Sequence, residues 1–309
     1  MHANAITPES HHAAAPPPPK EPVVIPHPSA VEPVPAAASA EPVRARQPNR
    51  ERNRRIALSL LLPLLTFLVI IAAWSALQKT ITPELPTPGE TWEHAKSVLS
   101  DPFYENGPND MGVGWQLLYS LGRVAAGFGL AALVGIPLGF LMGMSVNVQR
   151  AISPLIQILR PVSPLAWLPI GLLTFKAVDP SAIFVIFITC IWPMILNTAA
   201  GVKAIPQDYM NVAAVLKLGK LELARRILLP ATLPYVVTGM RLSLGVAWMV
   251  IVAAEMLTGG IGIGFWVWDE WNNLYVPSII VAIALIGLVG IALDALMGLA
   301  QSRLDYTKR

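Results

Sequence analysis

The chain has 309 residues, of which 54% are hydrophobic and 13% are charged, and its mean hydropathy is positive. This composition excludes an ordinary soluble domain of this size and is typical of a membrane protein. The formal net charge is only +3. Because membrane topology accounts for the placement of the basic residues, we expect no nucleic-acid partner. The single cysteine, Cys190, excludes an intrachain disulfide.

The N-terminal segment, residues 1–55, is rich in proline and alanine and ends in a cluster of arginines. Its most extreme part is the proline run at residues 16–19. Such a segment has too few apolar side chains to offset the entropy lost on ordering, so we predict a disordered tail in the cytosol. The chain is therefore divided into this tail and a membrane domain over residues 56–309.

Six apolar runs follow the tail, and each is long enough to cross a bilayer as a helix. Their approximate bounds are 56–77, 115–144, 155–175, 182–200, 233–257 and 278–299. With six crossings and the arginines of residues 44–55 inside, the positive-inside bias places both termini in the cytosol. The sequence thus predicts an all-α, polytopic membrane protein with six transmembrane helices. Pro161, Pro164 and Pro169 should interrupt the third helix.

Two local signals refine this prediction. The polar segment 78–114 should lie outside the cell, and within it Thr87, Pro88 and Glu90 have the spacing of a helix capping box. In the second membrane helix, glycines recur on one face and should let a neighbouring helix approach closely. These glycines are Gly127, Gly135, Gly139 and Gly143.

The segment 203–230 separates two apolar runs and is too charged to cross a bilayer. Four of its apolar residues recur at helical spacing and should form one apolar face. They are Val212, Leu216, Leu223 and Ile227. Gly219 near the middle is a natural break, so we predict two short helices joined by a turn. On the cytosolic side, such an element either meets a soluble partner or rests on the membrane surface.

This segment resembles the cytosolic coupling loop of bacterial ABC importer permeases. The resemblance rests on residues 213–214, Gly219 and residues 227–230, with Ala213 at the position where that family usually has glutamate. A register two residues earlier would instead place Asn211 at the glutamate and Lys217 at the glycine. Three further motifs resemble the branch that serves nitrate, bicarbonate, taurine and alkanesulfonates. They are residues 120–124, 159–169 and 197–202. Residues 253–259, followed by 262–265, are more narrowly similar to nitrate permeases.

The resemblance implies the permease subunit of a binding-protein-dependent, ATP-driven importer for nitrate or nitrite. Its implied partners are ABC ATPase subunits, an external substrate-binding protein and a second copy of the permease, in the lipid bilayer of a bacterial cytoplasmic membrane. It implies no catalytic residue, metal or cofactor in this chain, and Gly219 and Lys220 lack the surrounding residues of a P-loop. The residues implied in ATPase coupling are Ala213, Ala214, Leu216, Gly219, Glu222, Arg226 and Pro230.

Charged residues within the predicted membrane helices are candidates for function, because a bilayer interior disfavours charge. Arg123, Arg160 and Arg241 offer positive charge to a small anion on its path. Arg123 and Arg241 can instead pair with a carboxylate, and Arg160 can instead mark the cytosolic interface. Glu255 would repel an anion, so we expect it to be the structural partner of an arginine, with Arg123 as one possibility.

Alternative functions stay open from the sequence. Within the same family, the substrate can be bicarbonate, cyanate or a sulfonate such as taurine. From another class, an ion-driven secondary transporter or channel commonly shows repeated halves, and the sequence has no clear repeat. The predicted spans hold no cluster of His or Cys residues, which disfavours a membrane enzyme.

Overall fold

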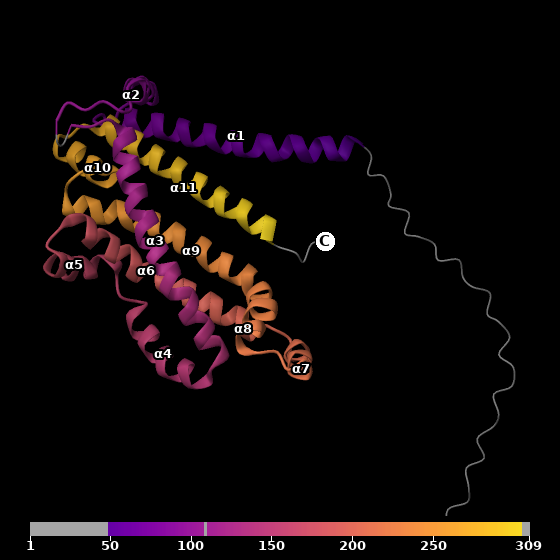
Figure 1. The fold of residues 1–309 in the computed structure, drawn as a ribbon. Coiled ribbons are helices and arrows are strands. Elements are labelled where there is room, and N and C mark those ends of the chain that lie inside the picture. Colours follow the sequence, from indigo (N-terminus) through magenta and orange to yellow (C-terminus); the bar gives the residue numbers. More distant parts are fainter. Residues whose placement is uncertain (1–48, 108–109, 305–309) are drawn as a thin grey trace, which may run out of the picture. The chain divides into compact units, whose positions relative to one another are not determined.

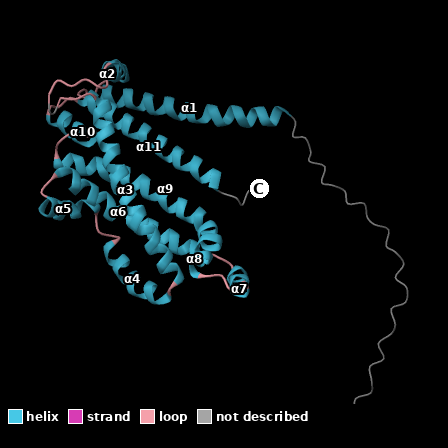
Figure 2. Ribbon diagram, viewed as in Figure 1, coloured by secondary structure: helices cyan, strands magenta, loops and turns pink. Residues whose placement is uncertain are grey.

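The computed structural model describes residues 49–107 and 110–304. The tail predicted for residues 1–48 therefore lies outside the described residues, and residues 49–55 belong to the first helix. The regular structure in the described part is helical, without strands (Figure 2). In chain order its elements are α1 (Asn49–Thr80), α2 (Pro88–Ser100), α3 (Val113–Met144), α4 (Val146–Leu159), the 3₁₀ turn η1 (Pro164–Trp167), α5 (Leu168–Phe175), α6 (Val178–Lys203), α7 (Gln207–Val215), α8 (Lys220–Leu223), the π-helical turn η2 (Ala224–Leu228), α9 (Leu229–Thr258), α10 (Ile263–Asn272) and α11 (Val276–Leu304). The chain divides into two units, Met1–Leu62 and Pro63–Arg309, and the second holds every helix after α1.

The core of the second unit is built around α6, which packs against both α3 and α9 (Figure 1). Ile186 and Met194 of α6 and Ile251 of α9 are almost completely buried. In a bilayer, close packing rather than the hydrophobic effect drives the association of such apolar helices. The position of α6 therefore depends on how closely its neighbours can approach it.

The contact between α3 and α6 depends on the glycine stripe of α3. A Cβ atom added at Gly127 would lie 2.7 Å from the Cβ atom of Ile186, and one added at Gly139 would lie 2.6 Å from that of Thr198. Carbon atoms that are not bonded cannot approach each other so closely without displacing one another. The prediction that these glycines admit a neighbouring helix is confirmed, and α6 is that helix.

In the described part of the chain, five helices are long and apolar enough to cross a membrane without a break. They cover residues 61–80, 113–144, 178–203, 224–258 and 276–303. A sixth crossing is obtained when α4 and the segment η1–α5 are counted together as one bent span. The predicted all-α membrane fold is thus confirmed as five unbroken helices and one broken pair.

The third predicted span differs from the single interrupted helix expected over residues 155–175. It begins at Val146, and its two parts are inclined by 97° to each other. Pro161 follows the residue that caps α4, and Pro164 opens the next turn. Because proline has no N–H and restricts the residue before it, neither position can continue the helix of α4. The prolines therefore separate two helices instead of bending one.

The fifth predicted span also differs from expectation. The sequence places the end of a short helix at Pro230 and a new helix from Leu233, whereas the structure has one continuous helix from Ala224 to Thr258. The Leu229 N–H donates to the carbonyl of Ala224, which makes a π turn. This wider turn directly before Pro230 leaves space for a proline ring that would clash within a regular α-helix. The predicted coupling segment is consequently joined to α9 without a loop.

Helix α2 is attached to the start of α11. The Thr87 hydroxyl accepts the Glu90 N–H at 3.2 Å, and the Glu90 carboxylate accepts the Thr87 N–H at 2.8 Å. The predicted capping box is thus confirmed. His94 Nε2 lies 2.8 Å from Ser278 Oγ of α11. Burial lowers the pKa of His94, which favours the neutral imidazole in this contact.

We expect Gly139→Ala to destabilise the protein, although alanine is the better helix former. The new methyl group would lie 2.6 Å from Thr198 Cβ, and such overpacking costs about 1–3 kcal/mol. Gly129→Ala is the matched control, because a Cβ atom there meets nothing within 4 Å. This control should stabilise the helix by roughly 0.5–1 kcal/mol. Thermal unfolding of the purified protein in detergent compares the two, and equal stability would contradict the described packing.

Candidate functional site

The predicted coupling loop consists of α7 and α8 with a short turn between them (Figure 1). The end of α7 follows a common closing pattern, in which the Leu218 N–H donates to the carbonyl of Ala213 at 3.1 Å. The Lys217 N–H donates to the carbonyl of Ala214, also at 3.1 Å. This pattern requires one left-handed residue, and Lys217 takes that role with a φ of 50°. The turn expected at Gly219 is therefore made at Lys217, and Gly219 directly precedes α8.

The apolar residues of the loop do not share one face, contrary to expectation. Tyr209, Val212 and Leu216, on α7 and its C-cap, are each more than half exposed. Leu223 and Ile227 are half-buried and belong to α8 and η2. The turn between α7 and α8 separates the two sets, so they face different surroundings. We call Tyr209, Val212 and Leu216 the α7 stripe, which is an exposed apolar surface at helical spacing.

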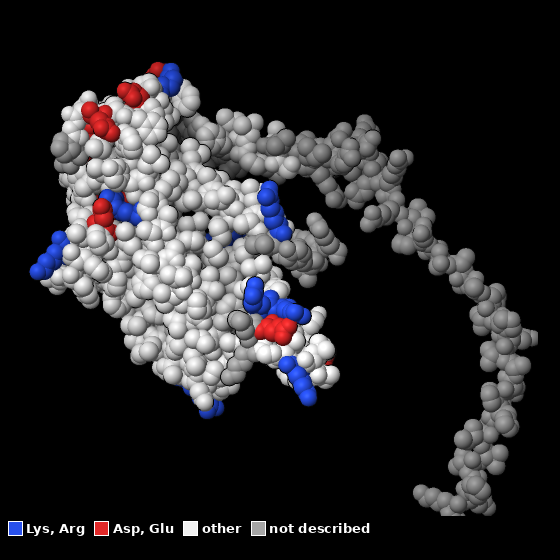
Figure 3. Space-filling view, in the orientation of Figure 1, with Lys and Arg blue, Asp and Glu red and all other residues white. Residues whose placement is uncertain are grey.

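The other residues implied in coupling differ in their exposure. Ala213 is buried, whereas Ala214 and Pro230 are exposed. Glu222 and Arg226 form an ion pair of 2.9 Å. In Figure 3, basic and acidic side chains gather around α7 and α8, while the middle of the visible face is largely uncharged. The loop is thus a charged, solvent-adapted element attached to an apolar bundle.

A cavity of about 620 Å³ lies between the loop and the ends of α3 and α6. Most of its lining is apolar and includes Met144, Met210 and Leu228, with Lys203 as a charged member. Methionine side chains are flexible and fill irregular spaces. The loop therefore faces the bundle across a cavity lined mainly by apolar side chains, two of which are flexible methionines.

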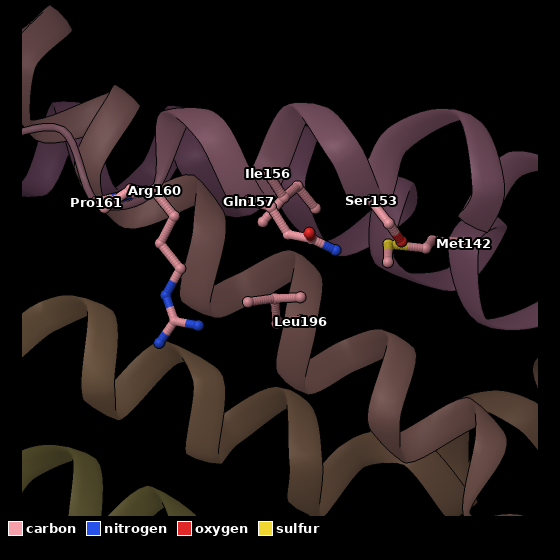
Figure 4. A pocket seen from close by; sticks show the side chains of 7 residues that line it. All are labelled: Met142, Ser153, Ile156, Gln157, Arg160, Pro161 and Leu196. Carbon is pink, nitrogen blue, oxygen red and sulfur yellow. The ribbon is translucent and has the colours of Figure 1, made fainter.

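Arg160 borders a second cavity, of about 450 Å³, between α3, α4 and α6. Its lining, shown in Figure 4, consists of Met142, Ser153, Ile156, Gln157, Arg160, Pro161 and Leu196. Arg160 forms no ion pair with any residue that the structure describes. Its guanidinium, the Ser153 hydroxyl and the Gln157 amide are hydrogen-bond donors that an anion can use. This cavity is the one that brings a candidate arginine together with other polar groups and leaves its charge unpaired.

Arg123 and Glu255, a pair considered from the sequence, are in direct contact near the other end of the bundle. Arg123 Nη1 lies 2.6 Å from Glu255 Oε1, and the exposed fractions of these side chains are 8% and 1%. The second carboxylate oxygen of Glu255 lies 2.8 Å from Ser120 Oγ and accepts the Gly264 N–H at 3.0 Å. The buried charges are tolerated because each has a partner and additional hydrogen bonds.

The loop before α10 adds contacts that the sequence did not predict. The Gly262 N–H donates to Gln116 Oε1 at 2.6 Å, and Arg123 donates to the carbonyl of Ile261 at 2.6 Å. A Cβ atom at Gly262 would overlap the Glu255 carboxylate, so this close approach requires glycine. The sequence feature that could have predicted this close approach is the glycine content of the loop, since four of the six residues 259–264, shortly after Glu255, are glycine.

Arg241 is bound to Asp294 of α11. Arg241 Nε and Nη2 each lie 2.6 Å from a different carboxylate oxygen of Asp294. This two-point contact joins α9 to α11 and provides a partner for the Arg241 charge. Of the three candidate arginines, Arg123 and Arg241 are thus paired, and Arg160 is the one without a carboxylate partner in the part of the chain that the structure describes.

A bundle of apolar helices with a broken pair, buried charges and an exposed helical loop between two spans is typical of polytopic membrane transport proteins. Residues 135–306 match the family described as the inner membrane component of binding-protein-dependent transport systems. The chain belongs to this family, and the permease family predicted from the sequence is confirmed.

Relatives include permeases of two kinds. The chain is 48% identical over 242 residues to the nitrate import permease protein NrtB of Leptolyngbya laminosa. This match covers 77% of this chain and 85% of the relative. The chain is 42% identical over 270 residues to the bicarbonate transport system permease protein CmpB of Synechococcus elongatus. This match covers 84% of this chain and 97% of the relative. The similarity to the two kinds of permease is comparable and extends over most of each chain.

The fold also resembles that of a solved transporter. A chain of the MetNI methionine ABC transporter, in inward-facing conformations, superimposes with a TM-score of 0.56 and 14% identity. The match covers 62% of this chain and 95% of that chain. At this identity the likeness shows a common fold.

We expect Glu255→Ala to destabilise the protein strongly, because it leaves the buried charge of Arg123 without its inner partner. Breaking a buried ion pair in this way costs about 3–5 kcal/mol. Glu222→Ala removes the partner of Arg226 from an exposed pair and should cost at most about 1 kcal/mol. Chemical unfolding of the purified variants measures both losses. Similar small losses would contradict a structural role for Glu255.

Proposed function

We propose that this protein is the transmembrane subunit of an ATP-driven importer for a small planar oxyanion, with nitrate as the substrate and nitrite as a related one. The observation that carries the proposal is the 48% identity to a nitrate import permease over 77% of this chain. Bicarbonate is the second candidate, because a bicarbonate permease is 42% identical over a similar share.

The Arg160 cavity suits the chemistry shared by nitrate and bicarbonate. Each of these anions holds three oxygens in one plane, and a guanidinium is also planar and can donate two parallel hydrogen bonds to such an anion. Gln157 and Ser153 line the same cavity and add neutral donors. A transport path needs binding that is strong enough for entry and weak enough for release. One arginine without a carboxylate partner among the described residues, in a cavity with neutral groups, is suited to binding of such intermediate strength.

The proposal assigns the α7 stripe to the contact with an ABC ATPase subunit, which binds and hydrolyses ATP while this chain has no catalytic role. Both termini and the α7–α8 loop then lie in the cytosol of a bacterial cell, and the chain spans the cytoplasmic membrane. Because the helix from Ala224 to Thr258 is continuous, a push on the loop is transmitted along α9. The cavity behind the loop allows that movement.

The remaining partners of the proposed importer act at the outer side and within the membrane. Membership of a binding-protein-dependent family supports an external protein that delivers the anion to the end where Arg123 and Glu255 lie. A second copy of this permease completes the path across the bilayer, and the ATPase subunits bind from the cytosol. No cofactor is assigned to the chain itself.

The transport proposal is tested with labelled nitrate in vesicles that contain the complete complex and its binding protein. We expect ATP-dependent uptake, with weaker competition from taurine than from unlabelled nitrate, and bicarbonate as the informative second competitor. Arg160→Gln should reduce uptake by about ten-fold or more, since a hydrogen bond to a charged group is worth roughly 1.5–3 kcal/mol. Arg150→Gln is the matched control, because Arg150 is an exposed residue of α4 outside the cavity lining.

Uptake that follows an ion gradient and needs no ATP would refute the importer. Equal uptake by the Arg160→Gln and Arg150→Gln variants would instead show that the Arg160 cavity is not part of the transport path. If bicarbonate inhibits the uptake of labelled nitrate more strongly than unlabelled nitrate does, then bicarbonate and not nitrate is the preferred substrate.

We expect Leu216→Asp to uncouple ATP hydrolysis from transport. Leu216 is 64% exposed, so the change leaves the core intact but places a charge in an apolar docking surface. Substrate-stimulated ATP hydrolysis should fall about five-fold or more, since burying an unpaired polar group costs roughly 1–3 kcal/mol. Leu216→Met keeps the surface apolar and serves as the control. The level of each variant in the membrane is measured alongside, and normal stimulation in Leu216→Asp would exclude the α7 stripe as the docking site.

A further inference from the structure

Arg123 has a second carboxylate partner, Asp179, in the first turn of α6. Asp179 Oδ1 lies 2.8 Å from Arg123 Nε and 2.7 Å from Nη2. One positive charge is thus placed between two negative ones. The inner carboxylate, Glu255, is 1% exposed, whereas the side chain of Asp179 is 63% exposed. The two carboxylates therefore differ in how easily they can leave the arginine.

The two edges of the Arg123 guanidinium have different hydrogen-bond partners. Nη1 donates to Glu255 and to the carbonyl of Ile261, both at 2.6 Å, and faces the buried side. Nε and Nη2 form the outer edge, which Asp179 occupies through a single oxygen.

The pair formed by Arg241 and Asp294 is a useful comparison. There both carboxylate oxygens are engaged, one with Nε and one with Nη2. Such two-point binding is the stronger arrangement for a carboxylate and a guanidinium. Asp179 is therefore a weaker partner for its arginine than Asp294 is.

Two cavities, of about 380 and 340 Å³, meet at the Arg123–Asp179 pair. Both are lined by Tyr119, Arg123 and Asp179. Because Arg123 is only 8% exposed and its inner edge is engaged, an anion in either cavity reaches the guanidinium by replacing Asp179. Exchange takes place on the outer side, where the Asp179 carboxylate is 63% exposed and water can solvate it after it leaves the arginine.

We propose that Asp179 is an internal competitor that occupies an oxyanion-binding edge of Arg123, and that a planar oxyanion such as nitrate displaces it on entry. The inference rests on the proposed function. Two oxygens of nitrate can accept from Nε and Nη2 at once, which Asp179 does not do here. Because one anion replaces another, the charge beside Glu255 is unchanged, and the observed contact of Asp179 shows that the buried pair accommodates a second negative group.

The test is equilibrium binding of nitrate to the complete complex, purified in detergent without the binding protein and measured by calorimetry. Asp179→Asn should bind nitrate roughly two- to five-fold more tightly than the natural protein, because the competing carboxylate is gone. Asp269→Asn is the matched control, since it removes an exposed negative charge in α10 that is not a partner of Arg123. Adding Arg123→Lys to Asp179→Asn should abolish the gain, because lysine has no two-donor edge.

Nitrate binding by Asp179→Asn that is unchanged, weaker or undetectable would overturn the inference, and so would an equal gain in Asp269→Asn. Where the Arg123→Lys double variant fails to fold, the comparison of the two single variants decides alone. The proposed function is judged separately, by ATP-driven uptake in the natural complex. Uptake of nitrate there, with no gain of binding in Asp179→Asn, would refute this inference and leave the proposed function intact.

Discussion

The buried contact between Arg123 and Glu255 fixes one end of the helix bundle. Neither charge is tolerable inside a membrane protein without a partner, so α3 and the end of α9 are drawn to the same place. The loop before α10 follows, because the Gly264 N–H satisfies the second carboxylate oxygen. Gly262 is required beside it, since any side chain there would occupy the space of the carboxylate. One ion pair thus holds α3 against the end of α9 and against the loop that directly follows α9.

The close packing of α3 and α6 extends the effect of the Arg123–Glu255 pair to a third helix of the bundle. The glycines of α3 let α6 approach, and that approach places Asp179, at the start of α6, against the outer edge of Arg123. The far end of α6 leads into α7, and α9 begins at the other end of the same loop. Two of the three helices that hold the charged cluster, α6 and α9, therefore also carry the loop. A movement of the loop must act on the cluster through these two helices.

The features that were predictable from the sequence depend on local or periodic patterns. Membrane helices, the Thr87 capping box and the glycine stripe are of this kind. The 97° bend is not, because prolines show where a helix breaks and not in which direction the chain continues. Gly219 suggested the turn, but the Leu218 N–H donates to the carbonyl of Ala213, and this closure makes Lys217 the left-handed residue. Asp179 was not predicted, because the expected helix began at residue 182 and left Asp179 outside it, whereas α6 begins at Val178.

The three candidate arginines illustrate how a permease can attract an anion without trapping it. Three unpaired guanidiniums in a low-dielectric path would bind a small anion too strongly for release. Here Arg241 is neutralised by Asp294 through two contacts, and Arg123 is held between two carboxylates. In the proposed exchange, Arg123 becomes available when an anion replaces Asp179. Arg160, at the end nearer the loop, has no carboxylate partner among the residues that the structure describes. In the proposed importer, an anion would therefore move from Arg123, where Asp179 competes with it, to Arg160, where no such competitor is described. The affinity for the anion would thus increase in the direction of import.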